Sequence, residues 1–312
     1  MRRLATDNSK EMAAFGAILT DASPEAFVES YRTLAAFNQT PSVMASRRFS
    51  STPSLEDLKG LIIDDKDLYA LTKCRVQESD VKLSEPDIAK FQLIVGSAPR
   101  LTSKLKAQLA AGYKKLLVER AQVYLAKGTA GLGSFADHGE PVKVHETFVS
   151  LAREQTASAG HCEHLYSYLK DYPGGVAPDS ESFIYWVKQK LGGLKPVINL
   201  VHIFIHREGN RVFIASKQLY SSHYTEGGLS VMELIPFTDS QGQPHTLVLY
   251  WIRLQVDMLG GALSFMKKRM AHPRMLRTLQ DGLNGIRLDM ERPAVANKEH
   301  KVGFVLNLQS AF

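Results

Sequence analysis

The chain has 312 residues, 44% of them hydrophobic and 22% charged, with a mean hydropathy of -0.15. These values are typical of a soluble globular protein with an ample core, and they exclude a low-complexity chain. The net charge of +6 is mild and no recognition motif accompanies it, so we expect no nucleic-acid partner. Peripheral contact with an anionic membrane surface is an alternative use of the same charge.

The sequence carries no targeting or membrane-spanning signal. No run approaches the roughly 18 apolar residues of a transmembrane helix, and the N-terminus turns polar directly after Arg2 and Arg3. We therefore expect a cytoplasmic protein, or a periplasmic or secreted one if the chain begins inside a longer precursor. Cys74 and Cys162 allow one disulfide but no disulfide framework. The oligomeric state is left open.

The N-terminal part predicts a strand, a helix and a second strand. Glu11–Thr20 is strand-like, and Ser23 then provides an N-cap for a helix over Pro24–Phe37, whose apolar residues recur at helical spacing. Ser42–Ser50 predicts the next strand. Residues from about 55 to 172 follow as a mostly helical block.

Within this block, Ser103–Lys127 predicts the longest helix of the first half, and His145–Leu169 predicts another helix or a pair of helices. After the block, Asp179–Lys190 is short and rich in aromatic residues. Three strand-like runs then follow at Val197–His206, Arg211–Ile235 and Thr246–Asp257.

The C-terminal part predicts a long amphipathic helix over Met258–Arg292. Pro273 is expected to kink or break it. Before it, Gly227 and Gly228 interrupt the second run, which predicts a bulge or a sharp bend. Residues 293–312 form a predicted tail, with a last short strand at Val302–Leu306.

This order of elements gives the α+β class. We predict a single domain over residues 1–312, in which a curved antiparallel sheet grips a long C-terminal helix. The helical insertion covers about residues 55–172, and the core sheet and closing helix cover residues 173–292.

Two resemblances to known protein families add to this prediction. The strand and helix of Ile18–Phe37, with Ala22-Ser23-Pro24-Glu25-Ala26-Phe27 between them, resemble the start of a START-like helix-grip domain of the SRPBCC type. The closing strands and helix resemble its end, so about half of the chain is covered. Such domains bind lipids or other apolar ligands between the sheet and the C-terminal helix, and the resemblance implies a similar cavity here.

The second resemblance is to an uncharacterised bacterial protein family, and it implies no activity. It rests on four pieces of the sequence: Cys74…Asp80-Val81-Lys82-Leu83, Leu194-Lys195-Pro196-Val197, Lys217-Gln218-Leu219-Tyr220-Ser221-Ser222-His223-Tyr224 and Arg253…Asp257-Met258-Leu259-Gly260-Gly261. Members often have a second cysteine shortly after the first. Ser79 in that region argues against a disulfide or a metal there.

Lys217–Tyr224 is the densest polar and aromatic cluster of the predicted sheet. Strand alternation places Lys217 and His223 on one face, and Tyr220 and Tyr224 on the other. The two tyrosines could present hydroxyls to a ligand, and His223 could act as a general base. The competing interpretation is a half-buried strand whose hydroxyls are satisfied by the protein.

Other polar residues give weaker candidates. His202 and His206 share a strand face but stand ~13 Å apart, too far for one metal ion, so we interpret His202 as a cavity-facing residue. The segment His161-Cys162-Glu163-His164 lacks further ligands at a recognisable spacing. We therefore predict no metal site.

Arg253 and Asp257 fall on one predicted strand face, where they could form a structural ion pair or anchor an acidic ligand group. No phosphate loop and no nucleophile motif is present, and we predict no cofactor. On the closing helix, Met266 and its neighbours Met258 and Met270 are candidate cavity-lining residues, although a plain core stripe would look the same.

The leading hypothesis is binding or transport of a hydrophobic small molecule, such as a lipid, between the sheet and the C-terminal helix. A second hypothesis is an enzyme of cyclase, hydrolase or lyase type on the same scaffold, using the histidine and tyrosine cluster. A third is a structural or interaction protein without a cavity.

Overall fold

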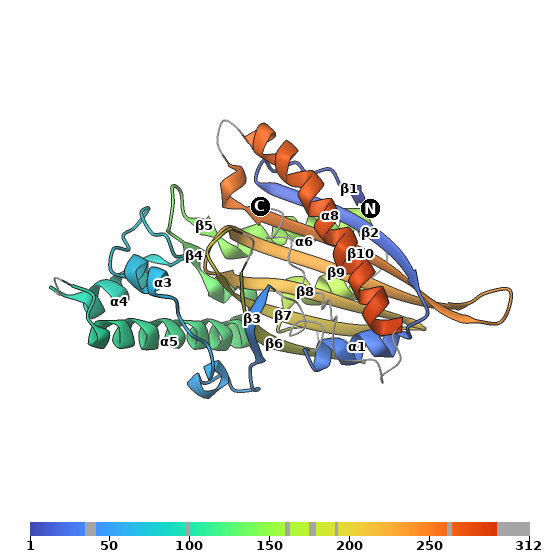
Figure 1. Ribbon diagram of the computed structural model, residues 1–312, viewed down its shortest axis with the longest axis horizontal. Coiled ribbons are helices and arrows are strands. Elements are labelled where there is room, and N and C mark those ends of the chain that lie inside the picture. Colours follow the sequence, from blue (N-terminus) through green and yellow to red (C-terminus); the bar gives the residue numbers. More distant parts are fainter. Residues whose placement is uncertain are drawn as a thin grey trace.

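The computed structural model describes residues 1–34, 42–97, 100–159, 163–174, 179–190, 193–260 and 264–291. Within these residues, an eight-stranded antiparallel sheet has the strand order β1-β2-β10-β9-β8-β7-β6-β3 (Figure 1). Its strands are β1 (Arg2–Arg3), β2 (Glu11–Thr20), β3 (Val43–Arg48), β6 (Ser180–Gln189), β7 (Val197–Glu208), β8 (Arg211–Ser221), β9 (Thr225–Thr238) and β10 (Pro244–Val256). The predicted α+β class is confirmed.

Helices cover both faces of this sheet. α1 (Pro24–Arg32) and α8 (Ser264–Glu291) lie on one face, while α5 (Ser103–Lys127), α6 (Val144–Ala159) and α7 (Glu163–Asp171) pack on the other (Figure 1). The shorter elements are η1 (Leu55–Leu58), α3 (Asp65–Leu71), α4 (Glu85–Val95), η2 (Gly128–Leu132), η3 (Asp257–Leu259) and the small pair β4 (Ser134–Phe135) and β5 (Val142–Lys143). Of the helices in the described ranges, none has the length and apolar content to cross a membrane.

The closing helix α8 packs on the sheet through one stripe of side chains. Ala271, Met275, Leu279 and Leu283 are buried there, and their spacing of four residues keeps them on one helical face. The helix runs unbroken through Pro273, contrary to one of the two expected outcomes. This stripe joins side chains of the sheet in a continuous core.

The methionines expected to line a cavity lie elsewhere. Met266 is 59% exposed, Met270 is 67% exposed, and Met258 in η3 is 43% exposed. The buried stripe begins at Ala271, one residue after Met270, so the helical rotation of about 100° per residue turns Met266 and Met270 away from the sheet. Met258 precedes α8 and lies just beyond the end of β10. Met266 therefore does not contact a cavity under α8.

The helical block shares its core with the sheet. Leu117 and Tyr124 of α5 belong to the same buried cluster as Trp186, Leu200 and Tyr220 of the sheet. A further cluster joins α6 and α7 to the same face at β8, β9 and β10. The block therefore buries the second face of the sheet and does not build a separate core.

The predicted run Arg211–Ile235 is wrong as one strand, because it forms β8 and β9. The chain reverses at Ser222 to Tyr224, and Tyr224 adopts a positive φ of 63° that lets it turn. Gly227 and Gly228, where we expected a bulge or a sharp bend, lie inside β9. The bulge is confirmed next to Gly227, because Gln255 pairs with Gly227 and Val256 pairs with Thr225, which leaves Glu226 as an extra residue. A Cβ on Gly228 would come within 2.7 Å of Leu254, so this glycine permits close packing and makes no turn.

A bulge in β8 also changes which face its side chains occupy. Leu200 pairs with Tyr220 and Val201 pairs with Gln218, so Leu219 is an extra residue in the strand. The bulge shifts the alternation by one residue and places Tyr220 on the same face as Lys217. The alternation predicted for Lys217–Tyr224 is therefore wrong beyond Gln218.

Two predicted elements are confirmed with their bounds, the strand Glu11–Thr20 and the helix Ser103–Lys127. The helix expected over Pro24–Phe37 is described as Pro24–Arg32, and Leu34 already has a φ of 55°. The tail 293–312, with its expected strand Val302–Leu306, lies outside the described residues.

The stripe of α8 predicts a mutational contrast. Leu279→Ala should lower the free energy of unfolding by about 3 kcal/mol, because it leaves a cavity between the helix and the sheet. Met270→Ala on the same helix should change it by less than about 0.5 kcal/mol, because that side chain faces solvent. Urea unfolding followed by circular dichroism measures both values, and equal losses would contradict this packing.

Candidate functional site

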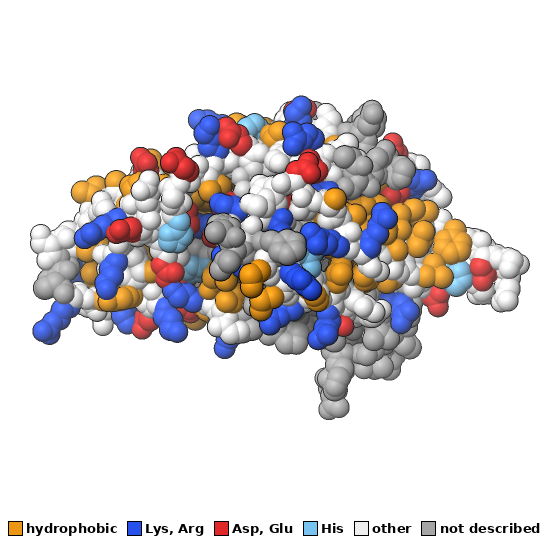
Figure 2. Space-filling model, turned by 90° about the horizontal axis from the view of Figure 1, so that it is seen from above, with side chains coloured by type: hydrophobic (Ala, Val, Ile, Leu, Met, Phe, Trp, Pro, Cys, Tyr) orange, Lys and Arg blue, Asp and Glu red, His pale blue; other side chains and the backbone are white. Residues whose placement is uncertain are grey.

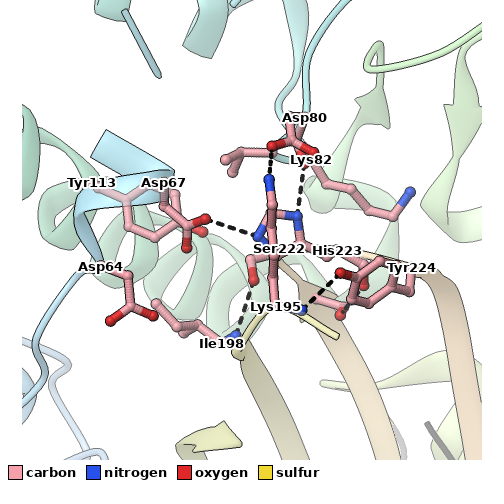
Figure 3. Close-up of polar contacts among 12 residues, drawn as sticks. Asp64, Asp67, Asp80, Lys82, Tyr113, Lys195, Ile198, Ser222, His223 and Tyr224 are labelled. Atoms are coloured by element: carbon pink, nitrogen blue, oxygen red, sulfur yellow. Dashed lines mark hydrogen bonds and ion pairs between the residues drawn. The ribbon is translucent and has the colours of Figure 1, made fainter. Parts of the chain in front are cut away.

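Parts of the four sequence pieces quoted above converge at one end of the sheet. The Lys82 amide donates to the Ser222 carbonyl over 3.0 Å, and the Lys82 Nζ lies 2.8 Å from Asp257 Oδ2. The Lys195 ammonium pairs with the Asp80 carboxylate (Figure 3). Residues more than 100 positions apart, such as Lys82 and Asp257, are therefore neighbours in the fold.

His223 lies buried between two acceptors (Figure 3). Its Nδ1 is 2.7 Å from the Asp80 carbonyl oxygen, and its Nε2 is 3.1 Å from Asp67 Oδ1. A carbonyl oxygen accepts only, so Nδ1 carries a proton and donates it to Asp80. Nε2 is occupied by its contact with the Asp67 carboxylate. Neither nitrogen is left to accept a proton from a ligand, so this geometry does not favour His223 as a general base.

Lys82 is a buried cation that contacts two carboxylates of this region. Its ammonium, 2% exposed, lies 3.0 Å from Asp137 Oδ2 and 2.8 Å from Asp257 Oδ2. Burial alone would lower the pKa of Lys82, but the negative charges of Asp257 and Asp137 outweigh it and raise the pKa above its ordinary value. Lys82 therefore remains an ammonium and links the two carboxylates.

A polar hollow of about 330 Å³ opens beside this ion pair cluster. It is lined mainly by charged and polar residues: Lys10, Asp80, Lys82, Asp137, His138, His223, Tyr224, Glu226 and Asp257, together with Val142 and Met258. Most of these charges are already paired within the protein, as Lys10 is with Glu226 over 2.6 Å. The hydroxyl of Tyr224 accepts from the Lys195 amide over 3.1 Å. The polar hollow therefore offers few unsatisfied groups to a ligand.

A larger, apolar hollow of about 560 Å³ lies on the other side of the segment from Ser134 to His138. Its apolar walls come from α4, α5, η2 and the segment that follows, namely Pro86, Leu116, Val123, Leu132, Ala136 and Pro141. Polar side chains at its edge include Asp87, Glu119 and Arg120. A mostly apolar recess with a few convergent polar groups is the usual character of a small-molecule site.

Arg120 is the one buried cation among the side chains that line the apolar hollow. Its side chain is 7% exposed, and its Nη2 donates to Asp87 Oδ2 over 2.9 Å. The guanidinium carbon lies 4.8 Å from the ring centre of Tyr220 and 5.4 Å from that of Phe135. The guanidinium of Arg120 is thus held in place, while its Nε–H donor has no acceptor in the described part of the chain.

Tyr220 contacts one lining residue of each hollow, Lys82 and Arg120. Its hydroxyl donates to the Lys82 carbonyl over 3.0 Å and lies 2.7 Å from the Tyr113 hydroxyl, which then donates to it. Its ring packs against Arg120 as described above. The predicted role of Tyr220, a hydroxyl presented to a ligand, is not what the contacts favour, because the hydroxyl is bonded within the protein.

His202 faces neither hollow. It lies under α5, with its Nδ1 2.9 Å from the Tyr124 hydroxyl, and burial together with the charge of Lys217 lowers its pKa to about 3. Lys217 itself is fully buried. Its Nζ donates to the Thr129 hydroxyl and the Leu169 carbonyl, both over 2.9 Å. Burial lowers the pKa of Lys217 to about 7.

The predicted pairing of Arg253 with Asp257 is wrong. Arg253 Nη1 lies 2.6 Å from Glu11 Oε1 on the neighbouring strand, and both side chains are buried. β10 ends at Val256, and the turn η3 directs Asp257 to Lys82. Arg253 therefore contributes a structural ion pair across β2 and β10, away from both hollows.

Metal binding finds no support in the described residues, which contain no group of three suitable side chains. The segment His161-Cys162-Glu163-His164, considered above for zinc, is described only in part. His161 and Cys162 lie outside the described residues, as do the side chains of Glu163 and His164. Cys74 is a free, buried thiol, and burial raises its pKa to about 11, which makes it unreactive.

Sequence reasoning missed Arg120 and Asp137. Arg120 carried a detectable signal, because it occupies the apolar stripe of α5 between Leu116 and Tyr124 at a spacing of four residues. A charge on a buried stripe marks a residue that needs partners. Asp137 carried no comparable signal, since only the fold brings it to Lys82.

The buried Lys217 predicts a pH dependence of stability. The unfolded chain, with an ordinary lysine pKa, binds this proton more tightly than the folded chain between about pH 7 and pH 10. Stability should therefore rise with pH across this window, by up to about 1.4 kcal/mol per pH unit from this group.

Lys217→Met should remove that rise, whereas Lys104→Met on the exposed side of α5 should keep it. Urea unfolding at several pH values measures the slope. The same slope in Lys217→Met and in the unaltered protein would show that Lys217 is not the titrating group.

Comparison with protein-family models and with curated protein sequences finds no match to this chain.

Proposed function

We propose that this protein binds a small amphipathic molecule with an acidic end, such as a fatty acid, in the apolar hollow. The apolar part of the ligand would contact Leu116, Val123 and Leu132, and its acidic group would accept hydrogen bonds from Arg120. The protein would act as a carrier or sensor of this molecule. The scaffold fits a helix-grip arrangement, in which α8 lies along the sheet.

The observation that carries the proposal is the buried guanidinium of Arg120 beside apolar walls. Arg120 is oriented by Asp87 and by two aromatic rings before any ligand arrives, so little side-chain entropy is lost on binding. Arginine donates two parallel hydrogen bonds to a carboxylate or phosphate. A volume of about 560 Å³ suits a small organic ligand.

This site differs from the one expected between the sheet and α8. There, Met275, Leu279 and Leu283 pack with side chains of the sheet in a continuous core. The apolar hollow instead lies within the helical block, which packs on the opposite face of the sheet. The proposal therefore keeps the expected class of ligand, a hydrophobic small molecule, but assigns it to the apolar hollow and not to the space under α8.

The location can be tested with a side chain that fills the hollow. Val123→Trp should weaken decanoate binding at least about tenfold, because Val123 is half-buried in the wall and the indole would occupy the space. Gln108→Trp adds the same ring to the exposed side of α5 and should leave binding unchanged. Isothermal titration calorimetry below the micelle concentration measures both. Unaltered binding to Val123→Trp would place the ligand elsewhere and defeat the proposal.

The role of Arg120 can be tested by comparing an acid with its alcohol. The unaltered protein should bind decanoate at least about tenfold more tightly than decanol, and Arg120→Met should abolish this preference. Circular dichroism must accompany the measurement, since Arg120→Met leaves Asp87 without its partner. Equal affinities for acid and alcohol in the unaltered protein would refute the assigned contact.

A further inference from the structure

The outer side of α8 carries many positive charges beside exposed methionines. We call this surface the α8 basic face, defined by the exposed residues Met266, Lys267, Arg269, Met270 and Arg277. Asp281 is the acidic residue among the described, exposed side chains of this helix. Figure 2, seen from above, shows Lys and Arg side chains beside hydrophobic ones on this side of the molecule, with Asp and Glu side chains among them.

The positive charges of this face are not neutralised by carboxylates in the described part of the chain. Arg269 and Arg277 make no ion pair there, and Lys267 donates to the Gly260 carbonyl over 3.1 Å. The neighbouring strand β1 adds Arg2 and Arg3, both exposed. The result is a local excess of positive charge, larger than the mild net charge of the whole chain suggests.

The effect of this charge is visible on a nearby group. The pKa of Lys268, on the same helix, is lowered by burial and, next, by the charge of Arg3. Its ammonium donates to the Asn8 carbonyl over 2.7 Å and to the Thr6 hydroxyl over 3.2 Å. Like charges thus crowd where β1 meets α8.

The exposed methionines help to decide which anionic partner fits this face, a lipid surface or a polynucleotide. Met266 and Met270 are 59% and 67% exposed, an unusual position for large apolar side chains on a charged helix. Flexible thioether chains next to cations suit the boundary between lipid headgroups and acyl chains. A polynucleotide would instead be met by stacked aromatic rings, and the described exposed side chains of α8 include none.

We propose that the α8 basic face docks the protein onto an anionic lipid bilayer, with Lys267, Arg269 and Arg277 contacting headgroups and Met266 and Met270 entering the interface. This inference rests on the surface of α8 and is independent of the ligand proposed for the apolar hollow.

Vesicle sedimentation tests the docking. The full chain should bind phosphatidylcholine vesicles that contain about one third phosphatidylglycerol, and should not bind phosphatidylcholine alone. The variant K267E/R269E/R277E should lose at least about tenfold in partitioning. The matched variant K66E/K104E/K115E makes the same change in net charge at exposed positions of α3 and α5 and should retain binding within about twofold.

Met266→Ser with Met270→Ser should leave binding at low salt but weaken it severalfold at about 500 mM salt, where screening removes most of the electrostatic part. Equal binding to both kinds of vesicle would overturn the proposal, as would equal losses in the two charge-reversal variants. Binding to single-stranded RNA without binding to vesicles would also overturn it and identify a nucleic-acid surface.

Discussion

The buried ammonium of Lys82 is the contact on which the arrangement of this molecule depends. It belongs to the helical block, whereas its partners Asp137 and Asp257 come from a later segment of the block and from the end of β10. A charge so deeply buried is tolerated only with partners of opposite sign and satisfied hydrogen bonds. The three residues therefore hold the block against the end of the sheet in one arrangement.

Backbone contacts extend this constraint. Asp137 is also held by a hydrogen bond from the Ser79 amide to its carbonyl over 3.1 Å, and the Ala136 amide donates to the Leu83 carbonyl over 2.8 Å. The segment that carries Asp137 separates the polar hollow from the apolar hollow. The walls of the two hollows are therefore positioned by the same hydrogen bonds and ion pairs. In this way the fold orders a site before a ligand is present.

The sequence predicted best those elements that depend on short-range pattern. The helix Ser103–Lys127 and the strand Glu11–Thr20 follow from periodicity and capping, and both have their expected bounds. The reversal at Tyr224 could not be predicted in this way, because no glycine, proline or asparagine marks it. Side-chain partners were predicted least well. Arg253 was paired with Asp257 because both fall on one predicted strand face, but Arg253 pairs with Glu11 of the adjacent strand.

The candidate site shows the same division. His223, Tyr224 and Asp257 were selected from the sequence and do line one hollow, since polar residues in an apolar sheet are visible in one dimension. Arg120 and Asp137 contribute through contacts that join distant segments. The distance between a buried charge and its partner is set by the packed layers, and the sequence alone does not contain it.

The bulge at Leu219 has a consequence for how this chain tolerates change in length. If the strand paired regularly through Leu219, without the bulge, Leu200 would pair with Leu219, and Tyr220 would turn to the opposite face, away from Arg120 and toward the side of α8. A single-codon deletion of Leu219 would be absorbed, because Gln218 and Tyr220 would become consecutive partners of Val201 and Leu200. A deletion of Ser216, inside the regular part of the ladder, would instead turn the residues on one side of it to the opposite face. Strand β8 keeps its two kinds of contact through the count of its residues as much as through their identity.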